Sequence, residues 1–185
     1  MTTCYVVVEA PTDAEILSIL LETRHSSVQA EIMIGRGRSS AVSLARTMLV
    51  SRPDALTALV LDADTTDRQR ISEMQAELEG SLVDVSRPER FGVFLFVPSI
   101  EACLFRDMDG LQDALGAAIS TEQMVQSRYD PKAVLRNQLQ RRDEDYNAKT
   151  VRAILDRLDV CRLQDAPVVR DLLEFVARSA ATAPA

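Results

Sequence analysis

The sequence predicts an α/β protein with a mainly parallel, four-stranded, Rossmann-like sheet flanked by helices. Up to about residue 105, β-branched, apolar or aromatic runs typical of strands alternate with segments of helical periodicity. Such alternation favours a parallel sheet, because each parallel connection needs a crossover. From Arg106 to Ala180 we find no convincing strand pattern and expect short helices. We therefore divide the chain into an α/β domain at 1–106, a helical C-terminal extension packed on it at 107–180, and a flexible tail at 181–185.

The first two expected strands are each followed by a helix. Cys4–Val8 is β-branched and leads to Glu9, and Thr12 with Glu15 fits a capping box for a helix that reaches about residue 22. A shorter strand, Gln29–Ile34, runs into the loop Gly35-Arg36-Gly37-Arg38, and the next helix is expected at 41–50.

The third and fourth expected strands are the most apolar. Ala58–Leu61 ends at Asp62, and Thr65 or Thr66 is expected to begin a helix that reaches Glu79, with Gly80 as its C-terminal cap. Residues 81–90 are predicted to form a weak strand or loop before a fourth strand at 91–97. Ser99 is the expected cap of a helix at 100–105, which places Glu101 in its first turn. Further helices are expected at 111–119, 131–140, 148–158 and 168–179, with Pro131 at a first helical position.

The third strand leads directly into two carboxylates, Asp62 and Asp64. Side chains two residues apart on an extended strand point the same way, so this pair is predicted to share one cation. Mg²⁺ and Mn²⁺ prefer oxygen ligands of this kind. The alternative is that the Asp and Thr residues at 62–67 only cap the following helix.

Glu9, Asp62, Asp64 and Glu101 all follow predicted strand ends, the edge where ligands of open α/β sheets gather. We expect Glu101, together with Asp67, to supply ligands for a second cation. Gly35, Arg36, Gly37 and Arg38 form a candidate phosphate-binding loop, because glycines let backbone N–H groups approach an anion and the arginines add donors. The alternative is an ordinary turn. Lys149, or Lys132, is a candidate for stabilising a leaving oxygen.

Composition narrows the classes of function. The net charge of −7 and the scarcity of aromatic residues argue against broad electrostatic attraction to nucleic acid and against a base-stacking platform. Three widely spaced cysteines and a single histidine, His25, give poor support to zinc or Ser-His-Asp chemistry. We find neither a signal peptide nor an apolar run that could span a bilayer, and we expect a cytoplasmic protein.

The two carboxylate segments also carry a family resemblance. Val7-Val8-Glu9-Ala10-Pro11-Thr12-Asp13, with Val60-Leu61-Asp62-Ala63-Asp64, resembles the TOPRIM domain of type IA topoisomerases, bacterial primases, ribonuclease M5 and OLD-family nucleases. That family has a Glu after the first strand and a DxD after the third, and usually a Gly where this chain has Ala10. The loop at 35–40 and the segment Pro98-Ser99-Ile100-Glu101 make residues 4–105 most similar to the small OLD-type branch.

The resemblance implies a Mg²⁺- or Mn²⁺-dependent nuclease that hydrolyses DNA or RNA with one or two ions. It implies that Glu9 ligates metal or acts as general acid or base beside Asp62 and Asp64. It also implies a partner protein, such as a separate ATPase, and a role in defence against phage; an oligomer is compatible with it.

Two other functions remain open. Asp62-Ala63-Asp64-Thr65-Thr66 also fits the nucleophile motif of haloacid-dehalogenase-like phosphatases, although two βα units precede it here. The protein can alternatively be a degenerate TOPRIM module that binds metal, nucleic acid or a partner without catalysis.

Overall fold

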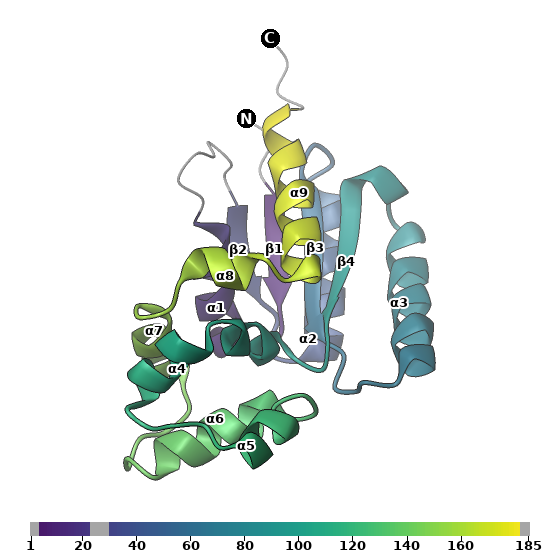
Figure 1. The fold of residues 1–185 in the computed structure, drawn as a ribbon. Coiled ribbons are helices and arrows are strands. Elements are labelled where there is room, and N and C mark those ends of the chain that lie inside the picture. Colours follow the sequence, from purple (N-terminus) through teal and green to yellow (C-terminus); the bar gives the residue numbers. More distant parts are fainter. Residues whose placement is uncertain (1–3, 23–29, 182–185) are drawn as a thin grey trace.

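Four parallel strands form the sheet around which the chain folds. They are β1 (Cys4–Val8), β2 (Ala30–Ile34), β3 (Leu56–Asp62) and β4 (Phe91–Phe96), in the order β2-β1-β3-β4 (Figure 1). The chain leaves β1 for β2 on one side, then passes to β3 and β4 on the other, which is the reversal of a doubly wound sheet. The expected α/β class with a parallel, Rossmann-like sheet is confirmed.

The computed structural model describes residues 4–22 and 30–181. His25, the expected strand residue Gln29, and residues 182–185 of the expected tail lie outside these ranges.

Each face of the sheet is covered by its own helices because side chains alternate along the strands. On β3, Leu59 and Leu61 pack with α2 (Arg38–Ser51) and α3 (Arg68–Val83). Ala58 and Val60 face the other core, with α1 (Pro11–Leu21) and α9 (Pro167–Ala181). In Figure 1, α9 crosses the front of the sheet and α2 lies behind it.

The helical extension shares the second of these cores with the sheet. Buried residues from 111 to 176 belong to the same apolar cluster as β1 and α1. Figure 1 shows α5 and α6 beyond the carboxyl ends of the strands. The elements are the 3₁₀ segment η2 (Ile100–Arg106), α4 (Met108–Leu115), α5 (Thr121–Gln126), α6 (Pro131–Gln140), α7 (Ala148–Leu155), α8 (Val160–Gln164) and α9. Pro131 takes the expected first helical position.

Several predicted helix ends are wrong for local reasons. The first helix is capped by Asp13, which accepts a hydrogen bond from the Ala10 N–H at 2.9 Å, and not by Thr12 with Glu15. α3 begins at Arg68, and it continues past Gly80 to Val83 because Leu82 is still packed in the core. α2 begins three residues earlier than expected, directly after Gly37.

After residue 85, several predicted elements also differ from those in the structure. Pro88–Arg90 is a short 3₁₀ segment, η1, and the helix expected at 100–105 is 3₁₀. α4 and α7 end earlier than expected, and α5 and α8 were not predicted.

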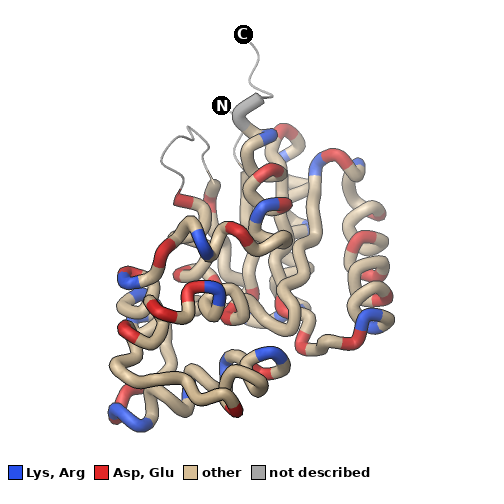
Figure 2. Tube along the Cα trace, in the orientation of Figure 1, with Lys and Arg blue, Asp and Glu red and all other residues tan. Residues whose placement is uncertain are grey.

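The surface carries charges of both signs. Figure 2 shows Lys and Arg interspersed with Asp and Glu along the trace, consistent with a modestly acidic chain. Among the described helices, none has the length and apolarity needed to cross a bilayer.

Gly35 offers a test of the packing between β2 and α2. A Cβ added to Gly35 would lie 2.4 Å from the Ala41 Cα, which is a backbone atom that cannot rotate away. We expect Gly35→Ala to lower the free energy of unfolding by about 1–3 kcal/mol in urea titrations. The control is Gly80→Ala, inside α3 with no atom within 4 Å of the new Cβ, which should raise stability by roughly 0.5–1 kcal/mol. Equal effects of the two substitutions would contradict this account.

Candidate active site

A pocket of ≈ 370 Å³ opens where β1 and β3 end side by side. We call it the carboxylate pocket. Four acids and two cationic side chains contribute to its lining, which comprises Glu9, Ala10, Pro11, Asp13, Arg36, Gly37, Asp62, Asp64 and Lys132. β1 and β3 are adjacent and parallel, so Glu9 and Asp62 reach the same edge. The expected meeting of Glu9 with the DxD segment is therefore found.

Arg38, in the first turn of α2, holds these acids together. Its guanidinium Nε lies 3.5 Å from Glu9 Oε1, and its Nη2 lies 2.7 Å from Asp64 Oδ2. The same Nη2 donates to the backbone carbonyl of Asp62 at 2.6 Å. One arginine thus joins the ends of β1 and β3, and its guanidinium contacts both Glu9 and Asp64.

The loop that carries Arg38 is fastened to β1. The Gly35 N–H donates to the Val8 carbonyl at 2.8 Å, and the Gly37 N–H donates to the Glu9 carbonyl at 2.9 Å. Gly37 has φ = +117°, a conformation that favours glycine. Arg36, with φ = +62°, lines the pocket and is exposed. Of the predicted phosphate-binding arginines, Arg36 faces the pocket and Arg38 is already paired with carboxylates.

The premise that Asp62 and Asp64 lie on one extended strand is wrong. β3 ends at Asp62, and Asp64 has φ = +53° in the left-handed region, with its N–H bonded to the Pro98 carbonyl at 2.8 Å. The turn separates the environments of the two carboxylates. Asp64 is 72% exposed beside Arg38, whereas half-buried Asp62 accepts a hydrogen bond at Oδ1 from the Ile100 N–H at 2.8 Å.

Asp62 is held in an environment that disfavours its charge. Burial, followed by the nearby charges of Glu101 and Asp13, raises its pKa to about 8, against the hydrogen bond from Ile100 and the charge of Lys132. Burial likewise raises the pKa of Asp13 to about 6, with Glu101 adding to the rise. The nearby cationic side chains do not offset the burial and crowding of these carboxyls. A bound cation would supply the missing positive charge.

Glu101 is fully buried and already satisfied. Ser99 Oγ donates to its Oε2 at 2.6 Å, and the Tyr146 hydroxyl donates to its Oε1. Lys132 Nζ lies 3.2 Å from the same Oε1. Burial alone would raise the pKa of Glu101, but the charge of Lys132 and these hydrogen bonds outweigh it and keep the pKa below its usual value. As described, Glu101 serves as an anchor for Lys132 and not as a free metal ligand.

Two other predicted site residues have different surroundings. Asp67 caps α3, since its Oδ1 accepts hydrogen bonds from the N–H groups of Gln69 and Arg70 at 2.9 and 3.2 Å. This is the capping alternative that the sequence left open. Lys149 is exposed in the first turn of α7, and it is Lys132 that lines the pocket.

Sequence reasoning missed Asp13 and Tyr146. Asp13 lies in the first turn of α1, where an acid is favourable for local reasons alone, and its place four residues after Glu9 is the available signal. Tyr146 lies in the loop before α7, about 45 residues from Glu101, and no local pattern links the two. Lys132, the alternative to Lys149 in the sequence analysis, is the lysine that lines the pocket.

No three Asp, Glu, His or Cys side chains are arranged to hold a metal ion within the described ranges 4–22 and 30–181. The contacts explain this, because Arg38 lies between Glu9 and Asp64 while Glu101 is bound to Lys132. A cation shared by Glu9, Asp62 and Asp64 therefore requires Arg38 to move.

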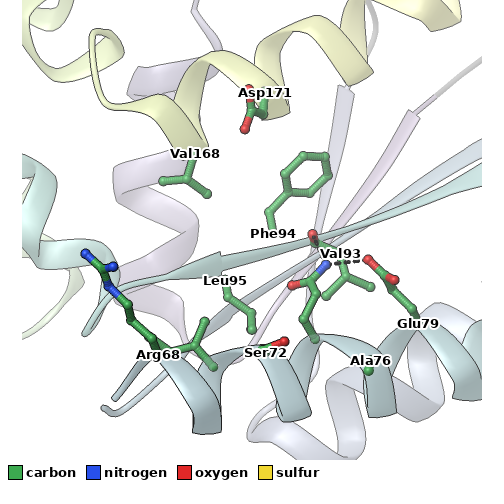
Figure 3. A pocket seen from close by; sticks show the side chains of 11 residues that line it. Arg68, Ser72, Ala76, Glu79, Val93, Phe94, Leu95, Val168 and Asp171 are labelled. Atoms are coloured by element: carbon green, nitrogen blue, oxygen red, sulfur yellow. Dashed lines mark hydrogen bonds between the residues drawn. The ribbon is translucent and has the colours of Figure 1, made fainter. Parts of the chain in front are cut away.

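A second hollow, of ≈ 650 Å³, lies between α3, β4 and α9 (Figure 3). Figure 3 shows Arg68 at the start of α3, Glu79 well separated from it further along the helix, and Asp171 across the hollow on α9. Gln75 donates to the Val93 carbonyl at 3.1 Å and so covers part of this sheet edge. The charged groups do not converge, and the carboxylate pocket remains the candidate site.

Comparison of the sequence with protein-family models finds no match, and comparison with curated proteins also finds none. The TOPRIM resemblance therefore rests on the residues and spacings themselves.

The pKa of Asp62 leads to a prediction about stability. A carboxyl whose pKa is about 8 when folded and near 4 when unfolded binds its proton more tightly in the native state, so its contribution to stability is present below pH 4 and is lost as pH rises towards 8. In metal-free buffer, Asp62→Asn should therefore raise Tm at pH 8 by several degrees, at roughly 2–4 °C per kcal/mol. The gain should shrink towards pH 5.

Asp109→Asn is the matched control, because the Asp109 side chain is 90% exposed and should show no such pH-dependent gain. A lower Tm for Asp62→Asn than for the wild type at pH 8 would contradict the proposed burial of charge.

Proposed function

We propose that the carboxylate pocket binds one or two Mg²⁺ or Mn²⁺ ions and hydrolyses phosphodiester bonds of DNA or RNA. The observation that carries this proposal is the convergence of Glu9, Asp62 and Asp64, from two separate strand ends, on one pocket. The crowded acids and the location at the reversal point of the sheet support it further.

The donor set suits a hard divalent cation. Glu9, Asp62 and Asp64 offer only carboxylate oxygens, as Mg²⁺ and Mn²⁺ prefer. Asp62 uses Oδ1 for the Ile100 N–H, and among the described residues its Oδ2 has no hydrogen-bond donor. Arg38 fills the place between Glu9 and Asp64 that positive charge is expected to fill. We take these residues as the ligands and assign Asp67 and Glu101 to structural roles.

A divalent cation at this site would supply Lewis acidity, polarising a phosphodiester oxygen and neutralising developing charge. The residues of the chain would do the rest. Glu9 would orient or deprotonate the attacking water. Arg36 and the displaced Arg38 would bind phosphate oxygens. Lys132, at the pocket wall, would stabilise the leaving oxygen in place of Lys149.

The same proposal covers the substrate polymer and the cellular role of the protein. The TOPRIM resemblance favours nucleic acid over small phosphate esters, and it favours a partner such as a separate ATPase and a role in phage defence. A cytoplasmic location and self-association are compatible with it. The acidic net charge means that attraction to a polyanion depends on the arginines around the pocket.

A second candidate is a non-catalytic TOPRIM-like module. It is favoured by the pairing of Arg38 with both Glu9 and Asp64 and by the lack of a preassembled ligand group in the described part of the chain. Such a module would bind metal or a partner without cleaving any polymer.

Nuclease assays test the proposal. We expect chelator-stripped protein to cleave at least one of labelled single- or double-stranded DNA or RNA after addition of Mn²⁺ or Mg²⁺. Glu9→Gln, Asp62→Asn and Asp64→Asn should each lower the rate at least about 100-fold, because each removes a ligand or base. The exposed Asp109→Asn should cleave at the wild-type rate.

Cleavage that persists unchanged in Glu9→Gln and Asp62→Asn would point to a contaminant or another site. Metal binding by calorimetry without cleavage would support the non-catalytic module. Rapid, metal-dependent turnover of p-nitrophenyl phosphate, with no action on polymers, would support a phosphatase instead.

A further inference from the structure

Tyr146 joins the helical extension to the carboxylate pocket. Its hydroxyl donates to Glu101 Oε1, the oxygen that Lys132 Nζ also contacts at 3.2 Å. The Nζ of the same Lys132 lies over the Tyr146 ring, 5.6 Å from the ring centroid. The Cζ of Arg136 lies over this ring at the same distance. Lys132 and Arg136 are four residues apart on α6, so one face of that helix packs on the ring.

The contacts of Glu101, Tyr146 and Lys132 set the charge or the position of each side chain. Glu101 is fully buried, with Ser99 donating to its Oε2, and in the described part of the chain Lys132 and Tyr146 both contact its Oε1. Burial and the charge of Glu101 raise the pKa of Tyr146, so its hydroxyl remains a neutral donor. Lys132, with its side chain 29% exposed, is the one member that also lines the carboxylate pocket.

We propose that Tyr146 is a positioning residue that holds the Lys132 ammonium at the wall of the carboxylate pocket. The ring confines the lysine side chain from one side through a cation–π contact. The hydroxyl shares Glu101 Oε1, which prevents the carboxylate from drawing the ammonium fully away from the pocket. The effect on catalysis rests on the proposed function, whereas the effect on Lys132 itself does not.

The residues of this contact come from separate parts of the chain. Glu101 follows β4, Lys132 lies on α6, and Tyr146 precedes α7, so the three meet only when the extension is docked on the sheet. The helical extension thereby supplies part of the site, and the α/β region alone lacks the pocket's lysine.

The chain contains only two lysines, Lys132 and Lys149, which permits a direct test. Reductive methylation of the full-length protein with ¹³C-formaldehyde, followed by NMR or peptide mass spectrometry, gives the rate at Lys132 with Lys149 as an internal reference. We expect Tyr146→Leu to raise the ratio of the two rates at least threefold, because the ring that covers Lys132 is lost. Tyr129→Leu, at a tyrosine that is 67% exposed, should leave the ratio unchanged.

A ratio in folded Tyr146→Leu equal to that of Tyr129→Leu would overturn the proposal. Tyr146→Phe, which keeps the ring, provides the measurement if the leucine variant fails to fold. We expect Tyr146→Phe to lower kcat/KM for phosphodiester cleavage about tenfold, without changing the Mn²⁺ affinity. In a Lys132→Gln background the same change should lower it less than twofold, because Tyr146 acts through Lys132.

An undiminished tenfold effect in the Lys132→Gln background would overturn the positioning role while leaving the nuclease activity in place. A wild-type protein that cleaves nothing would end the proposed function, and the methylation ratio would still decide the role of Tyr146.

Discussion

The site is governed by a shortage of positive charge at the carboxyl edge of the sheet. Besides burial, the charge of Glu101 raises the pKa values of Asp13 and Asp62, and Asp13 adds to the rise at Asp62. Among the described residues, Lys132 is the cation paired with Glu101. Glu101 pairs with that cation and stays ionised, whereas burial, together with the charges of Glu101 and Asp13, raises the pKa of Asp62 to about 8. An arrangement this unfavourable in isolation is typical of functional sites. Under the proposed metal binding, a cation would stabilise such a site.

The pairing of Arg38 with the pocket acids is the second consequence of that shortage of positive charge. By reaching Glu9, Asp64 and the Asp62 carbonyl together, it stabilises the strand ends and also blocks the position between two prospective ligands. The same contact is therefore compatible with a catalytic site awaiting its ion and with a module that has exchanged the ion for an arginine. If the proposed nuclease function holds, moving Arg38 onto a substrate phosphate would free the carboxylates, because the guanidinium would pair with the phosphate in their place.

Much of the α/β region was predictable because its signals are local. The runs Cys4–Val8 and Phe91–Phe96 mark strands by composition, and parallel pairing then brings Glu9 and Asp62 to one edge whatever the remaining details. The predictions that went wrong depended on backbone angles or distant packing. Asp64 leaves the extended conformation, Asp67 caps α3, and Gly80 remains helical because Leu82 is buried beyond it.

The sequence by itself determined the fold class, the order of the strands along the chain and the presence of acids at their ends, since each follows from periodicity and neighbouring residues. The tertiary structure alone decided which acids remain available and which are already paired. Glu101, Lys132 and Tyr146 are far apart in the chain and meet through the packing of α6 and the loop before α7 against η2. Contacts of that kind depend on side-chain position in three dimensions, which no short sequence pattern encodes.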